Sequence, residues 1–298
     1  MNGLLLIDKP SGMTSQAVVS RIRRLCGVKR VGHSGTLDPM ATGLLPVLVG
    51  NACPASDFLL NGDKTYEAVI QMGMTTDTED ITGTVLTSGE LPDGEAVLQT
   101  AASFIGEILQ IPPMYSAIKQ NGQPLYKLAR QGEETERQAR LVRVYEALPL
   151  WQKPEQGLYA FSFTVSKGTY IRTLAADIGK QLGCGACLAS LRRIAHGGLQ
   201  VEQAVSLAQV EEQGAEAYLQ SVETALGHLP VLNLASFYAR LIRNGCAVEG
   251  KKLGLNGQEN GAVFRLYACG RFFAIGQLEN EALRMIRFFE EPELGERA

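Results

Sequence analysis

The sequence predicts an α+β fold, in which a mixed, largely antiparallel sheet flanked by helices is followed by a small β-rich C-terminal domain. Apolar residues recur at strand period in some segments and at helical period in others, but the two kinds do not alternate regularly along the chain. A doubly wound parallel sheet needs that alternation, so it is disfavoured. Beyond about residue 230, strand-like runs follow one another between turn residues, at 262–268, 272–277 and 283–289. This change of pattern predicts a separate β-rich unit.

The N-terminal part begins with a short buried strand at residues 4–7. Ser15 is the expected N-cap of a helix that closes at Gly27, because hydroxyl side chains favour the cap position and glycine favours the position after the last turn. Three apolar residues of this helix share one face: Val18, Ile22 and Leu25. A glycine-rich segment at 32–43 and an apolar run at 44–49 come next.

Two further strands are predicted at residues 65–72 and 158–165, where apolar and polar residues alternate. The first strand places Tyr66 on its apolar side together with Ala68, Ile70 and Met72. A helix at residues 171–182 follows the second strand, because its apolar residues return at helical spacing.

The end of the first domain is marked by a capping pattern and a linker. Ser206 and Gln209 have the spacing of a capping box, which predicts the start of a surface helix. Residues 227–230 then have the composition of a linker. We therefore expect a catalytic domain over residues 1–228 and a β-rich domain over residues 229–298.

The composition is that of an ordinary soluble globular protein. Of 298 residues, 45% are hydrophobic and 20% are charged. No apolar run approaches the roughly 20 residues that a membrane span needs, and the N-terminus lacks the features of a secretory signal. We therefore expect the protein in the cytoplasm.

The six cysteines do not form a disulfide framework in a chain of this length. Cys184 and Cys187 have the C-x-x-C spacing of a redox site or of half a zinc site, but none of the three histidines has partner spacing. We expect no metal site, and we interpret the two cysteines as small residues that pack where two helices meet.

Charge is unevenly distributed, although the formal net charge is only −3. Residues 21–30 contain no acid and five basic residues: Arg21, Arg23, Arg24, Lys29 and Arg30. Residues 204–239, in contrast, contain four glutamates and no Lys or Arg. From charge alone, the basic stretch is equally a solvated helix face or a set of phosphate contacts.

The most unusual segment is GHSGTLDPMATG at residues 32–43, which has three glycines, one proline, one histidine and one carboxylate. Glycine allows positive φ and close approach of the backbone, and Pro39 fixes the chain just after Asp38. A carboxylate held on such a loop suits catalysis, although an Asp-Pro pair by itself is more typical of a turn. The segment does not match the P-loop, the dinucleotide fingerprint, H-E-x-x-H or G-x-S-x-G.

Residues 32–50, GHSGTLDPMATGLLPVLVG, resemble the signature of the TruB family of pseudouridine synthases. Four other segments resemble family motifs in the same order and spacing: 5–15, 64–83, 111–132 and 166–193. The tail after about residue 230 is similar to the PUA-like RNA-binding module often found at the end of these enzymes. One departure is Asn51-Ala52-Cys53, where acid-Ala-Thr is more usual; it involves no catalytic residue.

The resemblance implies an isomerase that converts the T-loop uridine of tRNA (position 55) to pseudouridine. The bond from N1 to C1′ breaks, the base turns, and a bond from C5 to C1′ forms. No electrons are exchanged, so no cofactor is expected. The resemblance also favours a monomer that binds the T-arm of tRNA and needs no protein partner.

The same resemblance assigns three catalytic residues. Asp38 is the nucleophile, and it attacks either C6 of the base or C1′ of the ribose. Arg172 pairs with Asp38 and favours its charged form, although its position alone is equally that of a solvated arginine. Tyr66 stacks on the target base and accepts the C5 proton; from periodicity alone it is more often a core aromatic.

Four further residues are assigned to the substrate site by resemblance. Leu191 packs beside the base, His33 lies near the flipped nucleotide, and Tyr170 is another active-site tyrosine. Lys9, with Pro10, supports the catalytic loop.

Two other functions are compatible with parts of the sequence. One is a tRNA-binding or tRNA-folding module without catalysis, which would have no need of Asp38, Tyr66 and Arg172 together. The other is an unrelated hydrolase that uses Asp38 with His33, which no oxyanion or metal motif supports.

Overall fold

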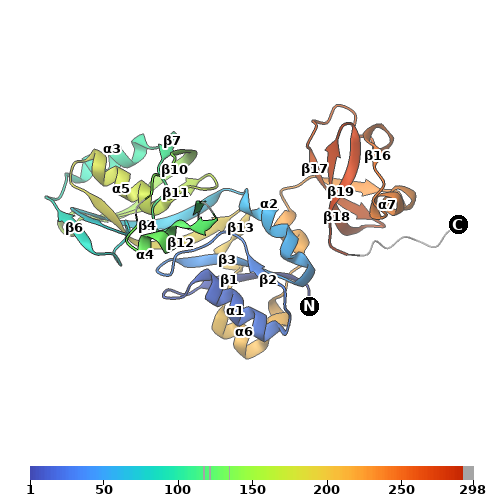
Figure 1. Cartoon of the computed structure of the whole chain (residues 1–298), viewed down its shortest axis with the longest axis horizontal. Helices are drawn as coiled ribbons and strands as arrows, with labels where there is room; N and C mark the ends of the chain where they lie inside the picture. The colour runs from blue at the N-terminus through green and yellow to red at the C-terminus, as the bar shows by residue number, and fades with distance from the viewer. Residues whose placement is uncertain (117, 121, 134, 291–298) are drawn as a thin grey trace.

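The structure is a computed structural model that describes residues 1–116, 118–120, 122–133 and 135–290. The expected motif at residues 111–132 and the expected domain at 229–298 therefore lie partly outside the described residues. The described chain forms a large body built on one sheet and a smaller C-terminal domain beside it (Figure 1).

The central sheet of the large body has ten strands among the described residues. Eight form a continuous path: β14 (Val205–Ser206), β1 (Gly3–Lys9), β3 (Thr42–Val49), β12 (Ala186–His196), β4 (Lys64–Met72), β11 (Leu158–Val165), β10 (Arg140–Lys153) and β7 (Gly106–Gln110). Two more are attached at the side: β2 (Val31–His33) to β3, and β13 (Leu199–Gln200) to β12. Only the pairs β1–β14 and β12–β3 are parallel. The predicted mixed, largely antiparallel sheet is confirmed, as are its strands near residues 65–72 and 158–165.

Helices cover one face of this sheet at two separate places (Figure 1). Helix α1 (Ser15–Cys26) packs on β2 and β3, whereas α5 (Ile171–Gln181) packs on β12 and β4. Helix α3 (Gly94–Ser103) lies beside α5 and β10. Their apolar sides join the sheet in one buried cluster, with Ile22 and Ile178 fully covered. No helix within the described ranges is long and apolar enough to cross a membrane.

The start of α1 differs from the prediction by one residue. Thr14 is the N-cap and accepts a hydrogen bond from the backbone N–H of Ala17 at 3.0 Å. Ser15 is the first helical residue, and its hydroxyl is bonded instead to the backbone of Leu37. The predicted apolar face is also partly wrong, because Leu25 is exposed whereas Cys26 is buried.

The prediction that Cys184 and Cys187 pack where two helices meet is wrong about the elements that carry them. Cys184 lies in the turn after α5, and Cys187 lies in strand β12, so the pair joins a helix to a strand rather than two helices. Both thiols are free.

The capping box at Ser206 and Gln209 is confirmed and opens α6 (Leu207–Gln213).

The C-terminal domain is a five-stranded sheet with one α-helix, α7 (Ser236–Arg243), in its described part. The strand order is β15 (Val231–Leu234), β17 (Val263–Ala268), β18 (Arg271–Glu279), β19 (Ala282–Phe288) and β16 (Val248–Glu249). The predicted strands at 262–268, 272–277 and 283–289 correspond to β17, β18 and β19. A separate β-rich C-terminal domain is therefore confirmed.

This domain joins a buried cluster on the face of β1 and β3 that α1 leaves free, where residues 50–55 and 222–226 lie against the two strands. Phe272, Ile275 and Phe289 share a buried cluster with Leu44 and Leu48 of β3. Polar contacts lie beside the cluster: Glu223 accepts hydrogen bonds from Arg265 (3.2 Å) and from the Tyr267 hydroxyl, and Arg287 lies 3.6 Å from Asp57. The strand that follows the glycine-rich loop is thus packed on both faces.

Replacing Phe272 by alanine should destabilise the protein, because it empties the centre of this shared cluster. We expect a loss of about 3–5 kcal/mol in the free energy of unfolding, measured by urea denaturation. The control is Phe237→Ala on α7, whose side chain is 63% exposed. That substitution should change stability by no more than about 0.5 kcal/mol. Equal effects of the two substitutions would show that the cluster does not hold the domain.

Candidate functional site

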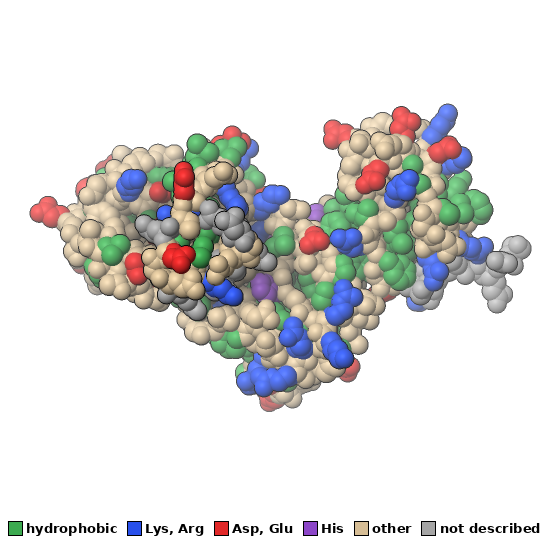
Figure 2. Space-filling view, in the orientation of Figure 1, with side chains coloured by type: hydrophobic (Ala, Val, Ile, Leu, Met, Phe, Trp, Pro, Cys, Tyr) green, Lys and Arg blue, Asp and Glu red, His purple; other side chains and the backbone are tan. Residues whose placement is uncertain are grey.

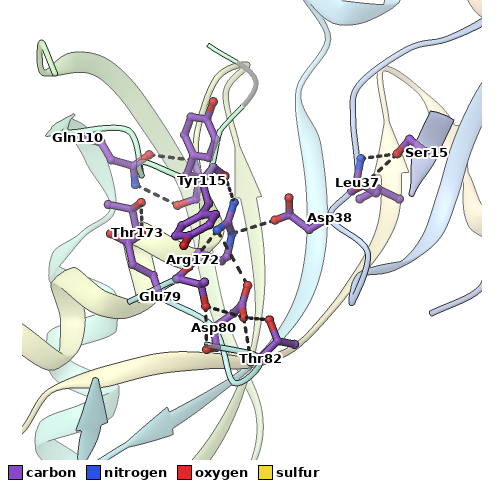
Figure 3. Close-up of polar contacts among 12 residues, drawn as sticks. Ser15, Leu37, Asp38, Glu79, Asp80, Thr82, Gln110, Tyr115, Arg172 and Thr173 are labelled. Atoms are coloured by element: carbon purple, nitrogen blue, oxygen red, sulfur yellow. Dashed lines mark hydrogen bonds and ion pairs between the residues drawn. The ribbon is translucent and has the colours of Figure 1, made fainter. Parts of the chain in front are cut away.

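Asp38 lies on the loop that joins β2 to β3, and the backbone of this loop is anchored on both sides of it. Before Asp38, Leu37 is buried, and its N–H and carbonyl are both bonded to the Ser15 hydroxyl, at 2.9 and 3.0 Å (Figure 3). After Asp38, the carbonyl of Pro39 accepts from the backbone N–H of Gly12 at 2.8 Å. The position of the carboxylate is therefore set by neighbours on both sides.

Lys9 provides a further anchor for this loop. Its buried ammonium donates to the carbonyls of Pro10 (2.9 Å), Met13 (2.6 Å) and Pro39 (3.2 Å). Burial lowers the pKa of Lys9 to about 8, and the charge of Asp38 opposes this shift. Lys9 thus ties the end of β1 to the residue after Asp38, and all three ammonium protons point to backbone oxygens.

Arg172 reaches Asp38 from the first turn of α5, across the gap between the two helix-covered parts of the sheet (Figure 3). Its Nε lies 2.8 Å from Oδ2 of Asp38. Its other nitrogens donate to the carbonyls of Thr78 (2.9 Å) and Tyr115 (2.8 Å). The side chain is only 5% exposed, so the alternative of a solvated arginine is wrong. The guanidinium plane is fixed by three partners and holds one orientation toward the carboxylate.

Asp80 is a second carboxylate at this site, and the sequence interpretation did not single it out as functional. Its Oδ2 lies 3.9 Å from Nη1 of Arg172. Its Oδ1 accepts from the Thr78 hydroxyl (2.9 Å) and from both the N–H (2.9 Å) and the hydroxyl (2.5 Å) of Thr82. The threonines that flank this buried aspartate in the sequence are the signal that could have revealed it, because they satisfy a carboxylate locally.

The segment that carries Asp80 is pinned to the central sheet. Ile81 N–H donates to the Leu188 carbonyl (2.9 Å), and Leu188 N–H donates to the Glu79 carbonyl (3.0 Å). Glu79 also accepts a hydrogen bond of 2.6 Å from Thr173, which is next to Arg172 on α5. These contacts fix the second carboxylate relative to the arginine.

The pKa of Asp38 is raised from its usual value, even though 36% of its side chain is exposed. Burial within the gap is the largest cause, and repulsion by Asp80 adds to it. Arg172 opposes the shift most strongly, through its charge and its hydrogen bond, and Lys9 opposes it weakly. The arginine therefore offsets part of a desolvation penalty.

Tyr66 and Leu191 lie in the floor of the site, on the adjacent central strands β4 and β12. Tyr66 is 7% exposed and Leu191 is 8% exposed, and both belong to the buried cluster that includes Leu37. In the strand register Leu191 is opposite Ala68, and Tyr66 is opposite Arg193. Both predicted residues therefore lie on the sheet face that carries α1 and α5.

Tyr170 is the N-cap of α5, two residues before Arg172. The side chain of Gln110, on β7, bonds its backbone twice: Tyr170 N–H donates to Oε1 (2.8 Å), and Nε2 donates to the Tyr170 carbonyl (3.1 Å). Burial raises the pKa of the Tyr170 hydroxyl, and the charges of Arg140 and Arg172 are among the influences that oppose this. Gln110 was not identified from the sequence, because its partner lies 60 residues away.

His33 ends β2, at the base of the loop that carries Asp38. Its Nδ1 is buried without a hydrogen-bond partner among the described residues. Burial lowers the pKa of His33, and the charge of Arg193 lowers it further. The imidazole is therefore held in its neutral form near the loop.

The five basic residues at 21–30, in α1 and in the segment between α1 and β2, divide into two groups. Arg21 is paired with Glu211 of α6, and Arg23 donates to the Val31 carbonyl at 3.2 Å. The other three are exposed: Arg24, Lys29 and Arg30. Figure 2 shows Lys and Arg side chains gathered on the lower part of this face, over the region of α1 and α2 (Ser56–Leu60) and toward the C-terminal domain. Of the five, the exposed three are the ones available to an anionic ligand.

Among the described residues, no group of three or more His, Cys, Asp or Glu side chains is placed to hold a metal ion. The site instead combines two carboxylates and one arginine with the nearby tyrosines Tyr66 and Tyr170. This arrangement can present a carboxylate to a planar, uncharged ring.

Comparison with known proteins identifies the family. The model of the TruB family pseudouridylate synthase N-terminal domain matches residues 23–171, and that of the tRNA pseudouridylate synthase B C-terminal domain matches residues 172–228. Proteins named tRNA pseudouridine synthase B are similar along nearly the whole chain. That of Dechloromonas aromatica is 45% identical, over 93% of this chain and 91% of its own length. That of Clostridium tetani is 38% identical, over 96% and 99%.

A solved structure shares the fold. It is that of a Cbf5-Nop10-Gar1 complex, in which the matching chain aligns with a TM-score of 0.76 at 26% identity. The alignment covers 99% of this chain and 87% of that one. The likeness therefore extends through both the large body and the C-terminal domain.

The raised pKa of Asp38 can be measured directly by carbon-13 NMR of its carboxyl group. We expect a midpoint above the usual 3.8, because burial disfavours the carboxylate. In Asp80→Asn the midpoint should fall, since that substitution removes a negative charge near Asp38. Asp93→Asn, at the N-cap of α3, is the control and should leave the midpoint unchanged. A wild-type midpoint at or below 3.8 would contradict the electrostatic account.

Proposed function

This chain belongs to the TruB family of pseudouridylate synthases, and we propose that it converts a uridine of tRNA to pseudouridine with Asp38 as the nucleophile. One observation carries the proposal: the loop that resembles the family signature presents Asp38 to the guanidinium of Arg172 at 2.8 Å. The substrate follows from the relatives, which are named for tRNA. The resemblance of the loop motif further supports position 55 in the T-loop.

The proposed reaction is an isomerisation in which atoms and electrons balance within the nucleotide. Asp38 attacks C6 of the base or C1′ of the ribose, and the bond from N1 to C1′ breaks. The base turns and C5 bonds to C1′; this displaces Asp38 from C1′ or, in the other route, is followed by elimination of Asp38 from C6. The C5 proton leaves and N1 takes up a proton, which regenerates the free carboxylate. No electron acceptor is needed, so we expect no cofactor. Only the carboxylate form of Asp38 can attack, and Arg172 favours that form.

Arg172 is proposed to orient the carboxylate as well as to keep it charged. Its two other hydrogen bonds, to backbone carbonyls, prevent the guanidinium from turning away. Asp80 lies on the far side of the same guanidinium, at 3.9 Å, and competes for its charge. The balance between the two carboxylates therefore sets how strongly Arg172 holds Asp38.

Tyr66 is proposed to stack on the uracil and to accept the C5 proton, and Leu191 to pack beside the base. Both are almost buried, and the uracil is proposed to lie against them. A stacked base costs about a few kcal/mol to flip out, and contact with Tyr66 and Leu191 compensates for part of that cost. Tyr170 lies near the charges of Arg172 and Asp38, and it and His33 are proposed to contact the flipped nucleotide.

Lys9 is proposed to act through the loop rather than on the substrate. Its three ammonium hydrogen bonds all go to backbone carbonyls, so it has no donor left for a phosphate. Lys9, which the resemblance assigned to the substrate site, is therefore proposed only to support the catalytic loop.

The C-terminal domain, which we place at residues 229–298, is proposed to be a PUA-like module that binds tRNA. Exposed lysines on its surface (Lys251, and Lys252, which lies 3.1 Å from Glu249) and the exposed basic residues Arg24, Lys29 and Arg30 of the large body would contact phosphates. We further propose that the protein acts as a monomer in the cytoplasm. The alternative of a tRNA-binding or tRNA-folding module without catalysis is not favoured, because the relatives are named as synthases.

Substituting Asp38 by asparagine should abolish catalysis, because the amide is a poor nucleophile of nearly the same shape. The assay is release of tritium from C5 of uridine in unmodified tRNA, with tRNA affinity measured in parallel. We expect release only from the wild type, and equal affinity for both proteins. Asp57→Asn, at a carboxylate that is 66% exposed, is the control and should remain active.

Two outcomes of that assay would overturn different parts of the proposal. A wild type that releases no tritium rules out pseudouridine formation. An active Asp38→Asn rules out the nucleophile while leaving the family membership intact.

Reversing two charges in the C-terminal domain tests its proposed role more cleanly than deleting it, since deletion would uncover the apolar cluster shared with β3. In the double variant Lys251→Glu, Lys252→Glu, tRNA affinity should fall roughly tenfold and its salt dependence should weaken. The rate at saturating tRNA should stay the same. Lys180→Glu, at the end of α5 far from Arg172, is the control. Unchanged affinity in the double variant would remove the RNA-binding role.

A further inference from the structure

Arg193 is a fully buried cation at the centre of the sheet, and none of the catalytic roles above uses it. It lies on β12 between the two strands that matter most for the site. Its backbone pairs with Gly43 of β3, the strand that follows the Asp38 loop, and with Tyr66 of β4. It is thus the one position of β12 whose neighbours on both sides belong to the proposed site or its loop.

The guanidinium of Arg193 holds the Asp38 loop at two points. Nη2 donates to the carbonyl of Gly35 at 2.9 Å, and Nε donates to the carbonyl of Leu44 at 2.7 Å. One carbonyl precedes Asp38 by three residues and the other follows it by six. A single rigid, planar group therefore spans the loop from one end to the other.

Two glycines of the loop are required by this residue. A Cβ at Gly35, where φ is +68°, would lie 3.0 Å from Nη1 of Arg193 and 2.9 Å from Cε1 of His196. A Cβ at Gly43, where φ is +96°, would lie 2.3 Å from the carbonyl oxygen of Arg193. The glycine-rich composition of the loop thus follows from how closely it wraps around the side chain and backbone of Arg193.

The charge of Arg193 has no carboxylate partner within the described residues, although a buried guanidinium without an ion pair is costly. The titratable groups next to Arg193 carry no negative charge that would balance its positive charge. His196 is neutral, with a pKa lowered to about 2 by burial and by the charges of Arg193 and Lys64. The pKa of Arg193 is itself lowered by burial, and Tyr66 is the group that opposes this shift. An uncompensated buried cation beneath a catalytic loop is difficult to explain by stability alone.

We infer that Arg193 is a positioning residue for the isomerisation, which holds the two ends of the Asp38 loop together and sets the loop over Tyr66. This inference rests on the proposed function, because positioning of the loop matters only if Asp38 and Tyr66 act on substrate. Arg193 does not touch the nucleotide. Its effect is to keep the carboxylate at the distance from the ring that attack requires.

The test compares Arg193→Lys and Arg193→Gln with the wild type. Lysine keeps the charge but cannot reach both carbonyls in one plane, and glutamine removes the buried charge while keeping one donor. For each protein, three quantities are measured: the single-turnover rate of tritium release, the affinity for tRNA, and the thermal unfolding midpoint. We expect the rate to fall roughly 100-fold in both variants, with tRNA affinity within about threefold of the wild type and with cooperative unfolding.

The neighbouring Arg192 is the matched control. It is paired with Asp8 at 2.8 Å and is 38% exposed, so Arg192→Lys should retain a rate within about threefold of the wild type. An inactive wild type would refute the proposed function on which the inference rests, whereas an active wild type with unaffected Arg193 variants would refute the role of Arg193 alone.

Two results would overturn the inference about Arg193. One is a folded Arg193→Lys or Arg193→Gln that reacts at nearly the wild-type rate. The other is a rate that falls only where tRNA affinity falls or cooperative unfolding is lost as well. Failure of both variants to fold is an extreme form of this second result. Either form of the second result would show that Arg193 is structural.

Discussion

The contact between Asp38 and Arg172 is the interaction on which the rest of the site depends. It joins the loop after β2 to the first turn of α5, which are elements on different parts of the sheet. A carboxylate in this gap would otherwise be driven toward its neutral form by burial and by Asp80. The arginine is in turn useful only because two backbone carbonyls hold it in place. The carboxylate of Asp38, on one part of the sheet, is thus stabilised in its charged form by an arginine from the other part.

The remaining architecture serves to keep this contact rigid while leaving the gap open. Lys9 at the end of β1 and Ser15 at the start of α1 hold the loop, and residues of the C-terminal domain join the buried cluster on the opposite face of β3. Strand β12 lies between the strand that follows the loop and the strand that carries Tyr66.

The fold class, the strands and the C-terminal domain could be predicted, because periodicity and turn residues are local signals. Asp38 could not be identified from its own surroundings, since Asp38-Pro39 alone is typical of a turn; the long signature around it supplied the assignment. Gln110 was missed because its partner Tyr170 is 60 residues away. Asp80 was missed because Arg172, which gives it a role at the site, is distant in the sequence, although the threonines that flank it are a local signal. Leu25 was misplaced since helical spacing does not say which edge of an apolar face meets the core. Local patterns identify elements, whereas the register between distant strands determines the site.

The most direct test of this account is the pH dependence of the single-turnover rate, compared with the titration of the Asp38 carboxyl group measured by NMR. Burial raises the pKa of Asp38, so its reactive carboxylate is lost as the pH falls through that raised value. The account predicts that the rate falls with the same midpoint as the carboxyl titration, above 3.8. A rate that stays constant while Asp38 becomes protonated would contradict it.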